Sequence, residues 1–503
     1  MSRSAWLSVS ILLLCVSAFL LSLNGCGGIS TAMPPGAKIQ HVVIIFQENR
    51  TPDNLFQGLC LPPNGSSSSC NSISPSASQY NIASSGVNST GQTIPLSQID
   101  LGTAGSNPDL YDLSHAHSAF VDMCDMNAST GVCAMDGADK IPIACQAGAT
   151  GCPPANPQFM YVNPADVQPY LTMAAQYTFA DQMFQTNEGP SFPAHQFIIS
   201  GTSAPTATSN LFASENPSGG GDGGNAGCIA PPAEVVKLID PLGSETSNAA
   251  IYPCFEHPTL TDLLDTANIT WRYYAPSPGS IWTAPNAIQH MCGPNATPPN
   301  ATACVGSDYS GTDPKVVVNQ NQSNAQILTD IANNQLPQVS WVIPTGQDSD
   351  HALSNTGCGP SWVTTVVNAI GNSSYWSNTV IILSWDDWGG WYDHVPPAVI
   401  SNGSSWGSGY LYGFRVPMVV MSPYAKPAYI SHATHDFGSI LKFIETNFKL
   451  PSLGYADVPA DDLSDIFNFA QTPIVFQTIT PPANTAACVA AAIVTPASDP
   501  DDD

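Results

Sequence analysis

Short apolar runs alternate with helical patterns along most of the chain, and this alternation restricts the fold more than any other sequence feature. The first run, HVVIIF, covers residues 41–46. A helical pattern leads into a strand-like run in each of four later segments, residues 170–184, 259–274, 324–344 and 361–385. A further strand is predicted over 414–422 and a closing helix over 436–448. Because strands that alternate with helices form a mostly parallel sheet covered on both faces, we predict a three-layer α/β/α fold.

Loop-rich insertions interrupt this pattern, and we expect them to pack over one end of the sheet. They are rich in Gly, Ser, Asn and Pro and cover roughly residues 57–160, 203–255 and 275–322. Twelve of the 14 cysteines lie beyond Cys26, and an even set in an exported chain predicts disulfides. Spacing alone suggests four local pairs: Cys60/Cys70, Cys124/Cys133, Cys145/Cys152 and Cys292/Cys304.

The N-terminus is typical of an exported protein. Arg3 precedes a long apolar stretch, and small residues then surround Cys26. We predict a signal peptide over 1–25, a linker over 26–37, a catalytic domain over 38–480 and an acidic tail over 481–503. Leu23-Asn24-Gly25-Cys26 resembles a lipoprotein processing box, in which Cys26 is lipidated and anchors the chain to a membrane. The predicted location is therefore secreted, periplasmic or, with lipidation, an outer surface.

Charge argues against a nucleic-acid partner. The 503 residues carry a formal net charge of −27 and only 11 lysines and arginines. Neutralising a phosphate backbone requires a basic surface, and this composition does not provide one.

Carboxylates and a histidine follow three of the predicted strands. The residues at these strand ends are Glu48 and Asn49; Asp348, Asp350 and His351; Asp386 and Asp387. Ligands of open parallel sheets bind beyond the carboxyl ends of the strands, and crowded carboxylates are reconciled by a cation. The pattern therefore indicates a site for a divalent metal ion, although each residue taken singly would be an ordinary turn residue.

Ser191 is a candidate nucleophile. The turn Gly189-Pro190 precedes it, and the following residues can start a helix, so Ser191 is expected at or near the helix N-cap. An isolated serine at a helix start is usually only a cap. No GxSxG motif surrounds Ser191, so an acyl-transfer triad is not indicated.

Four segments resemble the successive signature blocks of the bacterial phosphoesterase family, which contains phospholipases C and acid phosphatases. They are IQHVVIIFQENRTPDNLFQ, NEGPSFPAHQFIISGT, SWDDWGGWYDHVPP and GFRVPMVVMSPYAK followed by HATHDFGSILKFIE. The blocks occur in the family's order and span about residues 38–450. The resemblance implies an alkaline-phosphatase-like fold and a phosphoric ester hydrolase. Ser191 and the Asp386-Asp387 pair are closer to the acid-phosphatase branch than to many phospholipases C.

The resemblance also implies roles for individual residues. The metal would be held by Glu48, Asn49, Asp386 and Asp387, with Ser191 as both ligand and nucleophile. His351 falls where the family has a histidine that contacts phosphate or the leaving group. Further histidines of the site are placed near His115 or His117 and near His290.

Two other residues near these motifs each have two possible roles. Arg50 is a permanent cation that either contacts a phosphate oxygen or forms a structural ion pair. His394 is counted with the substrate-binding residues. Together with Asp393 it either joins a second metal or pins the DDWGG loop, and we favour the loop.

The substrate is a phosphate ester, but the sequence leaves phosphomonoester and phospholipid open. The expected chemistry is attack by Ser191 on phosphorus, followed by hydrolysis of a phosphoseryl intermediate. The alternative is a catalytically silent surface protein that binds a phosphorylated or glycan ligand in the same cleft. A sulfatase is a weaker option, because the sequence after Ser191 lacks the arginine of the sulfatase motif.

Overall fold

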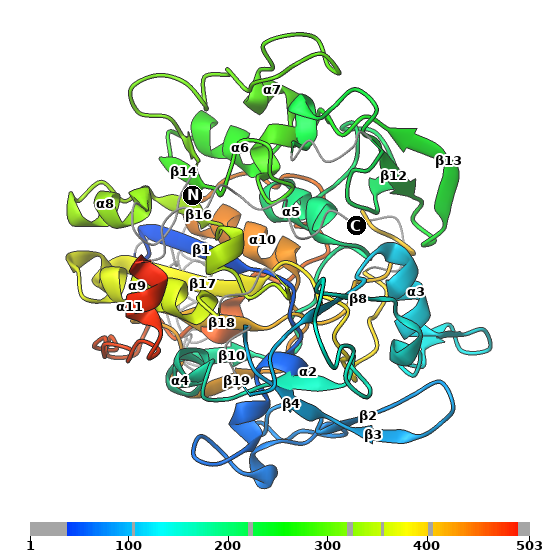
Figure 1. Ribbon diagram of the computed structural model, residues 1–503. Coiled ribbons are helices and arrows are strands. Elements are labelled where there is room, and N and C mark those ends of the chain that lie inside the picture. Colours follow the sequence, from blue (N-terminus) through cyan, green and yellow to red (C-terminus); the bar gives the residue numbers. More distant parts are fainter. Residues whose placement is uncertain are drawn as a thin grey trace, which may run out of the picture. The chain divides into compact units, whose positions relative to one another are not determined.

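The computed structural model describes most of the chain, namely residues 38–102, 106–219, 225–318, 325–353, 357–400 and 406–490 (Figure 1). The predicted signal peptide, the linker and Cys26 lie outside the described residues, as does the end of the predicted acidic tail, 491–503. Among the described residues, no helix combines the length and the apolar character needed to span a membrane.

An eight-stranded sheet forms the centre, in the order β15-β14-β16-β1-β17-β18-β10-β19. Its strands are β1 (His41–Gln47), β10 (Thr178–Ala180), β14 (Trp271–Tyr274), β15 (Val316–Val317), β16 (Val339–Val342), β17 (Thr379–Trp385), β18 (Met418–Met421) and β19 (Tyr429–Ser431). Pairing is parallel from β15 to β17 and again between β10 and β19. Only β18 runs antiparallel to its neighbours within this sheet as described. The prediction of a mostly parallel sheet is confirmed.

Strand β1 lies in the middle of the sheet because its side chains are apolar on both faces. Val42, Val43, Ile44 and Ile45 are fully buried, and Ile44 pairs with Trp341 of β16 and with Ile382 of β17. A continuous β-branched run is the signature of such a doubly covered strand.

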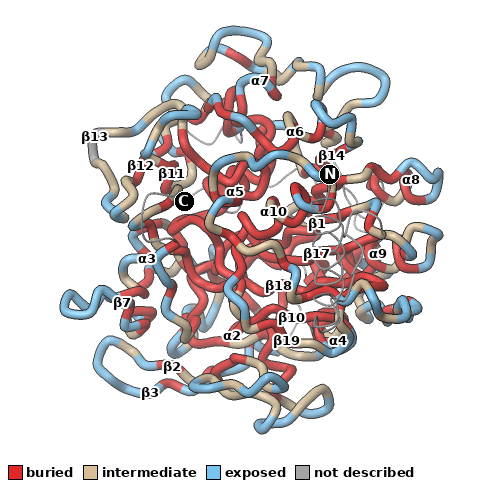
Figure 2. The backbone as a smooth tube through the Cα atoms, turned by 180° about the vertical axis from the view of Figure 1, so that it is seen from behind, coloured by how far each residue is buried: buried red, intermediate tan, exposed pale blue. Residues whose placement is uncertain are grey.

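Two groups of helices cover the sheet. The main helices are α4 (Gln168–Gln176), α5 (Ser191–Ser200), α6 (Leu260–Thr266), α8 (Gln326–Ala332), α9 (Gly359–Gly371) and α10 (Phe437–Phe448). Helix α9 contacts α4 and α8, whereas α5 contacts α6 and α10. Crossovers between parallel strands place helices on both faces of a sheet, so the two separate groups agree with the predicted three-layer fold. Figure 2 shows that burial is concentrated in the sheet and in the helices packed on it.

The insertions form small sheets and short helices. The strands are β2 (Ser85–Val87), β3 (Thr93–Pro95), β4 (Ser97–Ile99), β5 (Tyr111–Leu113), β6 (Met126–Asn127), β7 (Val132–Cys133), β8 (Ile143–Cys145), β9 (Met160–Val162), β11 (Phe212–Ala213), β12 (Val236–Ile239) and β13 (Glu245–Ile251). The helices are α2 (Pro52–Leu55), α3 (His117–Cys124), α7 (Gln289–Cys292) and α11 (Thr485–Ala490).

Disulfides hold these insertions together. All four pairs suggested by spacing are present and therefore confirmed. Two longer-range bonds, Cys228–Cys254 and Cys358–Cys488, could not be read from spacing. The second bond ties α11 to the start of α9, so the first part of the segment predicted as an acidic tail is attached to the folded domain.

Candidate active site

The carboxyl ends of three neighbouring parallel strands meet at one edge of the sheet. Glu48 and Asn49 follow β1, and Asp386 and Asp387 follow β17, which pairs with β1 along its whole length. His351 lies in the loop after β16, the other neighbour of β1. All five side chains are buried. The topology therefore brings together residues that are about three hundred positions apart in the sequence.

Helix α5 delivers Ser191 to this edge. Ser191 is the first residue of the helix and follows the N-cap residue Pro190. Its Oγ donates a hydrogen bond of 3.1 Å to Oδ2 of Asp387. The other oxygen of that carboxylate, Oδ1, accepts the backbone N–H of Gly389 at 2.7 Å. Asp387 is thus held by its own loop while it orients the serine hydroxyl.

The loop after β17 approaches the end of β1 very closely. The backbone N–H of Asn49 donates to Oδ1 of Asp386 at 3.1 Å. Asn49 has a positive φ of 65°, and Gly389 has a φ of 62°. A Cβ added to Gly389 would lie 2.3 Å from the carbonyl oxygen of Asn49. Glycine is required here both for its backbone conformation and for the close approach.

His195 joins the site, although the sequence analysis did not select it. Its Nε2 lies 3.4 Å from Oε1 of Glu48 and 3.7 Å from Oδ2 of Asp386. It follows Ser191 by four residues on α5, a spacing that places two side chains on one helix face. That spacing was the available signal, but the carboxylates on the far side of His195 are set by tertiary structure alone.

The donor set of these residues fits a divalent metal ion. Ligand atoms of Glu48, His195 and Asp386 all lie within 4.8 Å of one another, and the three side chains are fully buried. Buried carboxylates at such a distance repel each other unless a cation lies between them. Carboxylate oxygen and imidazole nitrogen are both common metal ligands in proteins.

His115 and His351 lie beside this cluster. Nε2 of His115 accepts a hydrogen bond of 3.1 Å from the side-chain amide of Asn49, and its Nδ1 donates to the carbonyl oxygen of Leu113. The ring of His351 lies 5.9 Å from that of His115 and 6.1 Å from that of Trp282. His115 therefore contacts the predicted metal ligand Asn49, and His351 lies next to His115.

His117 lies near the turn that precedes the nucleophile. Its Nε2 is 3.3 Å from Oε2 of Glu188, three residues before Ser191. Burial raises the pKa of Glu188 above its usual value. The same carboxylate accepts the backbone N–H of Leu411. His117 thus contacts Glu188, a residue of the segment that leads into the turn before Ser191.

Arg50 forms the structural ion pair that was one of its two predicted roles. Its guanidinium is fully buried and donates to Oδ2 of Asp109 at 2.9 Å and to the carbonyl oxygen of Asp350 at 2.8 Å. Its face lies over the ring of Trp391. The structural ion pair named as an alternative is the arrangement found, because the donors are already committed to protein acceptors.

The carboxylate of Asp350 is also structural. It accepts hydrogen bonds from Oη of Tyr170 at 2.9 Å and from Nε1 of Trp385 at 3.1 Å. Burial raises its pKa to about 6. The loop after β16 therefore carries both residues: His351 lies beside His115, and the carboxylate of Asp350 anchors the loop through Tyr170 and Trp385.

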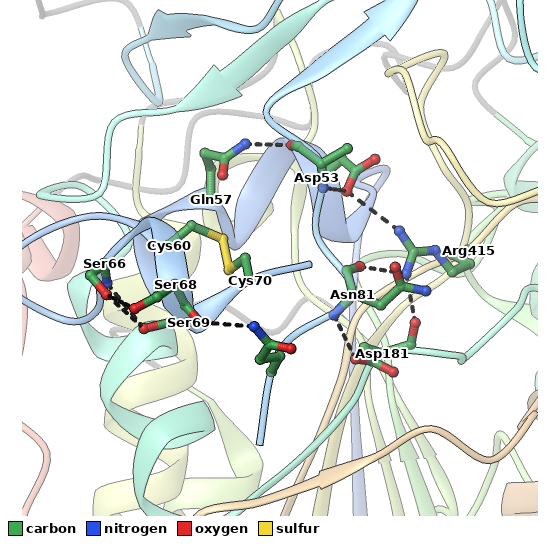
Figure 3. The surroundings of a disulfide bond; sticks show 12 residues. Asp53, Gln57, Cys60, Ser66, Ser68, Ser69, Cys70, Asn81, Asp181 and Arg415 are labelled. Atoms are coloured by element: carbon green, nitrogen blue, oxygen red, sulfur yellow. Dashed lines mark hydrogen bonds and ion pairs between the residues drawn. A yellow bond between two sulfur atoms is a disulfide. The ribbon is translucent and has the colours of Figure 1, made fainter. Parts of the chain in front are cut away.

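His394 belongs to a buried ion network around Arg415. Its Nδ1 lies 2.7 Å from Oδ2 of Asp53, and its Nε2 lies 2.9 Å from Oδ1 of Asn81. Arg415 donates to both oxygens of Asp393, each at 2.9 Å. Figure 3 shows Arg415 directed toward Asp53 and Asn81. The guanidinium of Arg415 already pairs with both carboxylates of this group, Asp53 and Asp393, which favours pinning of the loop over a second metal.

His290 lies in a surface ion pair rather than with the residues at the strand ends. Its Nδ1 is 2.9 Å from Oε1 of Glu256, and its Nε2 is 3.3 Å from Oδ1 of Asp262. The hydrogen bond to Asp262 is the largest effect that raises the pKa of His290 to about 9. Both carboxylates are about half exposed, and the pair with Asp262 links α7 to α6. The substrate contact of His290 stays a prediction.

Known proteins resemble the chain over most of its length. Phospholipase C A of Mycobacterium tuberculosis is 26% identical over 464 residues, which cover 86% of this chain and 78% of the relative. Hemolytic phospholipase C of Pseudomonas aeruginosa is 25% identical over 345 residues, which cover 61% of this chain and 43% of the relative. A crystal structure of a protein in the alkaline phosphatase superfamily from Vibrio parahaemolyticus matches with a TM-score of 0.33 and 12% identity, covering 59% of this chain and 64% of the other.

The family assignment agrees with the order of the four sequence blocks and with the residues gathered at the strand ends. Residues 39–451 match the Phosphoesterase family, a range that includes Glu48, Ser191 and the Asp386-Asp387 pair. The chain therefore belongs to the Phosphoesterase family and is a phosphoester hydrolase.

Proposed function

We propose that the chain hydrolyses phosphoric esters with the help of a divalent metal ion and through a phosphoserine intermediate on Ser191. One observation carries this proposal. The hydroxyl of Ser191 is bonded to Asp387, and the neighbouring residue Asp386 belongs to the buried cluster with Glu48 and His195. Two consecutive residues, Asp386 and Asp387, therefore connect the cation site to the nucleophile.

The reaction needs positive charge as well as a positioned oxygen. When bound, the cation would neutralise the charge that develops around phosphorus. In the described part of the chain, the buried arginines nearest in sequence to the site loops, Arg50 and Arg415, are committed to carboxylates. Neither guanidinium is available to a substrate, which supports dependence on the metal.

The residues at the strand ends supply the remaining steps. Asp387 orients the hydroxyl of Ser191 and accepts its proton as the serine oxygen bonds to phosphorus. The bond from phosphorus to the leaving alkoxide breaks, and we assign protonation of that alkoxide to His351, beside His115. Water then attacks the phosphoserine, releasing phosphate or a phosphomonoester and restoring the Ser191 hydroxyl.

We further propose that the chain is exported. The predicted signal peptide over 1–25 and six disulfides support an oxidising compartment. Lipidation of Cys26 would anchor the enzyme at a membrane. Labelling with a radioactive fatty acid tests this anchoring, because Cys26→Ala should abolish the label and release the enzyme from the membrane fraction.

Phospholipids are the favoured substrates, with phosphomonoesters as the second candidate. The relatives named phospholipase C support the first. The second is supported by Ser191 and the Asp386-Asp387 pair, which resemble the acid-phosphatase branch more than many phospholipases C. A catalytically silent binding protein is no longer favoured, because the chain is a member of a hydrolase family.

A paired assay tests this proposal. We would measure release of phosphocholine from phosphatidylcholine vesicles and of phosphate from a chromogenic monoester, with and without chelator. Ser191→Ala should reduce turnover of both substrates by about 10⁴-fold or more. Ser200→Ala, which removes another buried hydroxyl of α5, is the matched control and should retain activity. Full activity of Ser191→Ala, or turnover unaffected by chelation, would refute the mechanism.

A further inference from the structure

His195 projects into the carboxylate cluster from the same helix that delivers Ser191. The imidazole is completely buried, and its Nε2 lies 3.4 Å from Oε1 of Glu48 and 3.7 Å from Oδ2 of Asp386. These separations resemble the spacing of ligands around one ion. Metal–ligand bonds of about 2.1 Å at tetrahedral angles separate neighbouring donor atoms by about 3.4 Å.

Tyr273 sets the tautomer of this imidazole from the other side of the ring. Its Oη donates a hydrogen bond of 3.0 Å to the carbonyl oxygen of Trp282 and lies 3.5 Å from Nδ1 of His195. A tyrosine hydroxyl has an ordinary pKa of about 10, so it keeps its proton at neutral pH. That single proton is directed at Trp282.

The hydroxyl oxygen of Tyr273 therefore acts as an acceptor toward His195. Nδ1 of His195 then carries the ring hydrogen, and Nε2 presents its lone pair to Glu48 and Asp386. An acceptor nitrogen facing two carboxylates in a fully buried site is electrostatically unfavourable without a cation. A neutral imidazole whose second nitrogen is fixed by a hydrogen bond is the usual form of a metal-ligating histidine.

We propose that His195 is a nitrogen ligand of the metal centre and that Tyr273 is its positioning residue. The inference rests on the metal of the proposed function and adds its chemical class. Imidazole prefers first-row transition ions such as Zn²⁺, whereas Mg²⁺ and Ca²⁺ prefer oxygen-only sites. The centre therefore selects a transition ion over Mg²⁺ and Ca²⁺.

Metal binding to the purified full chain tests this inference without reference to turnover. Metal content is measured on the protein as isolated, and affinities for Zn²⁺, Mn²⁺, Mg²⁺ and Ca²⁺ are obtained by competition with a chelating dye. His195→Ala should weaken Zn²⁺ binding by about 100-fold or more and leave Mg²⁺ binding nearly unchanged. Tyr273→Phe should weaken Zn²⁺ binding by about 10-fold, the lower end for loss of an outer-shell partner. Gln196→Ala, the next residue on α5, should bind as the wild type does.

X-ray absorption of the metal-loaded wild type gives a second readout that needs no variant. Scattering from an imidazole ring around the metal is expected, and its absence would overturn the inference even if His195→Ala failed to fold. Wild-type Zn²⁺ affinity in a folded His195→Ala would also overturn it. If the wild type hydrolyses esters and binds metal but prefers Mg²⁺ or Ca²⁺, only this inference fails. If the wild type binds no divalent ion, the metal centre of the proposed function fails.

Discussion

Ser191 and Asp387 are joined by a hydrogen bond of 3.1 Å between a helix start and a strand end that are 196 residues apart. The bond is fully buried on both sides. It makes the orientation of the nucleophile depend on the loop after β17, which also provides Asp386. Positioning of the hydroxyl and assembly of the cation cluster are therefore properties of the same short loop.

Asp387→Asn should show how much the negative charge of Asp387 contributes to catalysis. The amide is close in size to the carboxylate but carries no negative charge. We expect kcat to fall by about 10²- to 10³-fold, the range observed when one polar group that acts on the transition state is removed. Rapid quench with a labelled phosphate ester measures the phosphoserine burst, which should shrink in parallel. Asp139→Asn, at an exposed position, should behave as the wild type; an unchanged burst in Asp387→Asn would contradict the assigned role.

Gly389→Ala should damage the site through the backbone. The new Cβ would meet the carbonyl oxygen of Asn49 at 2.3 Å, in addition to the cost of a positive φ. Gly91→Ala is the matched control, because its φ is 78° and no atom lies within 4 Å of the added Cβ. The control should lose only about 1–2 kcal/mol of unfolding free energy. Urea denaturation should show a larger loss of unfolding free energy in Gly389→Ala than in Gly91→Ala. Measured metal content should fall in Gly389→Ala alone.

Arg415→Met should be strongly destabilising. It leaves Asp53 and Asp393 buried without their shared cation, a type of change that costs about 3–5 kcal/mol. Lys140→Met removes one partner of an exposed pair with Asp125 and should change stability by less than about 1 kcal/mol. Chemical denaturation of the two variants gives the comparison. Equal small effects would show that the Arg415 network does not pin the loop.

His257 should contribute a loss of stability in mild acid, opposite in sign to the contribution of Asp350, whose pKa is raised to about 6. Burial lowers the pKa of this histidine from 6.5 to about 4. The unfolded chain therefore binds a proton between these two values while the folded chain does not, so stability is fully present above pH 6.5 and is lost as the pH falls toward 4. The expected loss is about 3 kcal/mol. His257→Gln should flatten this part of the pH profile of unfolding free energy, and an unchanged slope would exclude His257 as its cause.

The two kinds of disulfide should differ in their contribution to stability. Cys358–Cys488 closes a segment of 130 residues, whereas Cys145–Cys152 closes one of 7. In the chain-entropy model, the first contributes about 5 kcal/mol and the second about 2 kcal/mol. Double alanine variants at each pair, compared by denaturant unfolding, should show this order. A smaller loss for the long-range pair would mean that α11 is held mainly by other contacts.

The sequence was sufficient to predict the sheet and the strand ends that carry the site. Runs such as 41–46 are apolar on both faces, and that pattern has few other structural interpretations. Parallel strands direct their carboxyl ends to one edge, so Glu48 and Asp386 could be placed together before their distance was known. The order of strands was not predictable, because every buried strand looks alike in sequence.

The individual roles of charged residues were harder to predict, for a physical reason. Arg50 and His394 lie next to motif residues in the chain, but their ion-pair partners, Asp109 and Asp53, are determined by how the loops pack in the folded protein. His195 was missed for the converse reason, since its carboxylate neighbours come from β1 and β17. Residues that are neighbours in sequence lie close together in any fold, whereas the partner of a charged side chain depends on which elements the tertiary structure packs against it.

The order of strands has a consequence for how the enzyme is made. β1 is the first strand of the central sheet to be synthesised, yet its two neighbours, β16 and β17, are complete only after residue 385. Glu48 therefore emerges from the ribosome long before any residue that it must meet. Contacts of such long sequence separation form slowly and late. A chain interrupted between α5 and β17 contains the nucleophile and two of the three cluster residues, Glu48 and His195, but lacks Asp386. It has no assembled centre, so catalysis requires that β17 and the loop after it have been made.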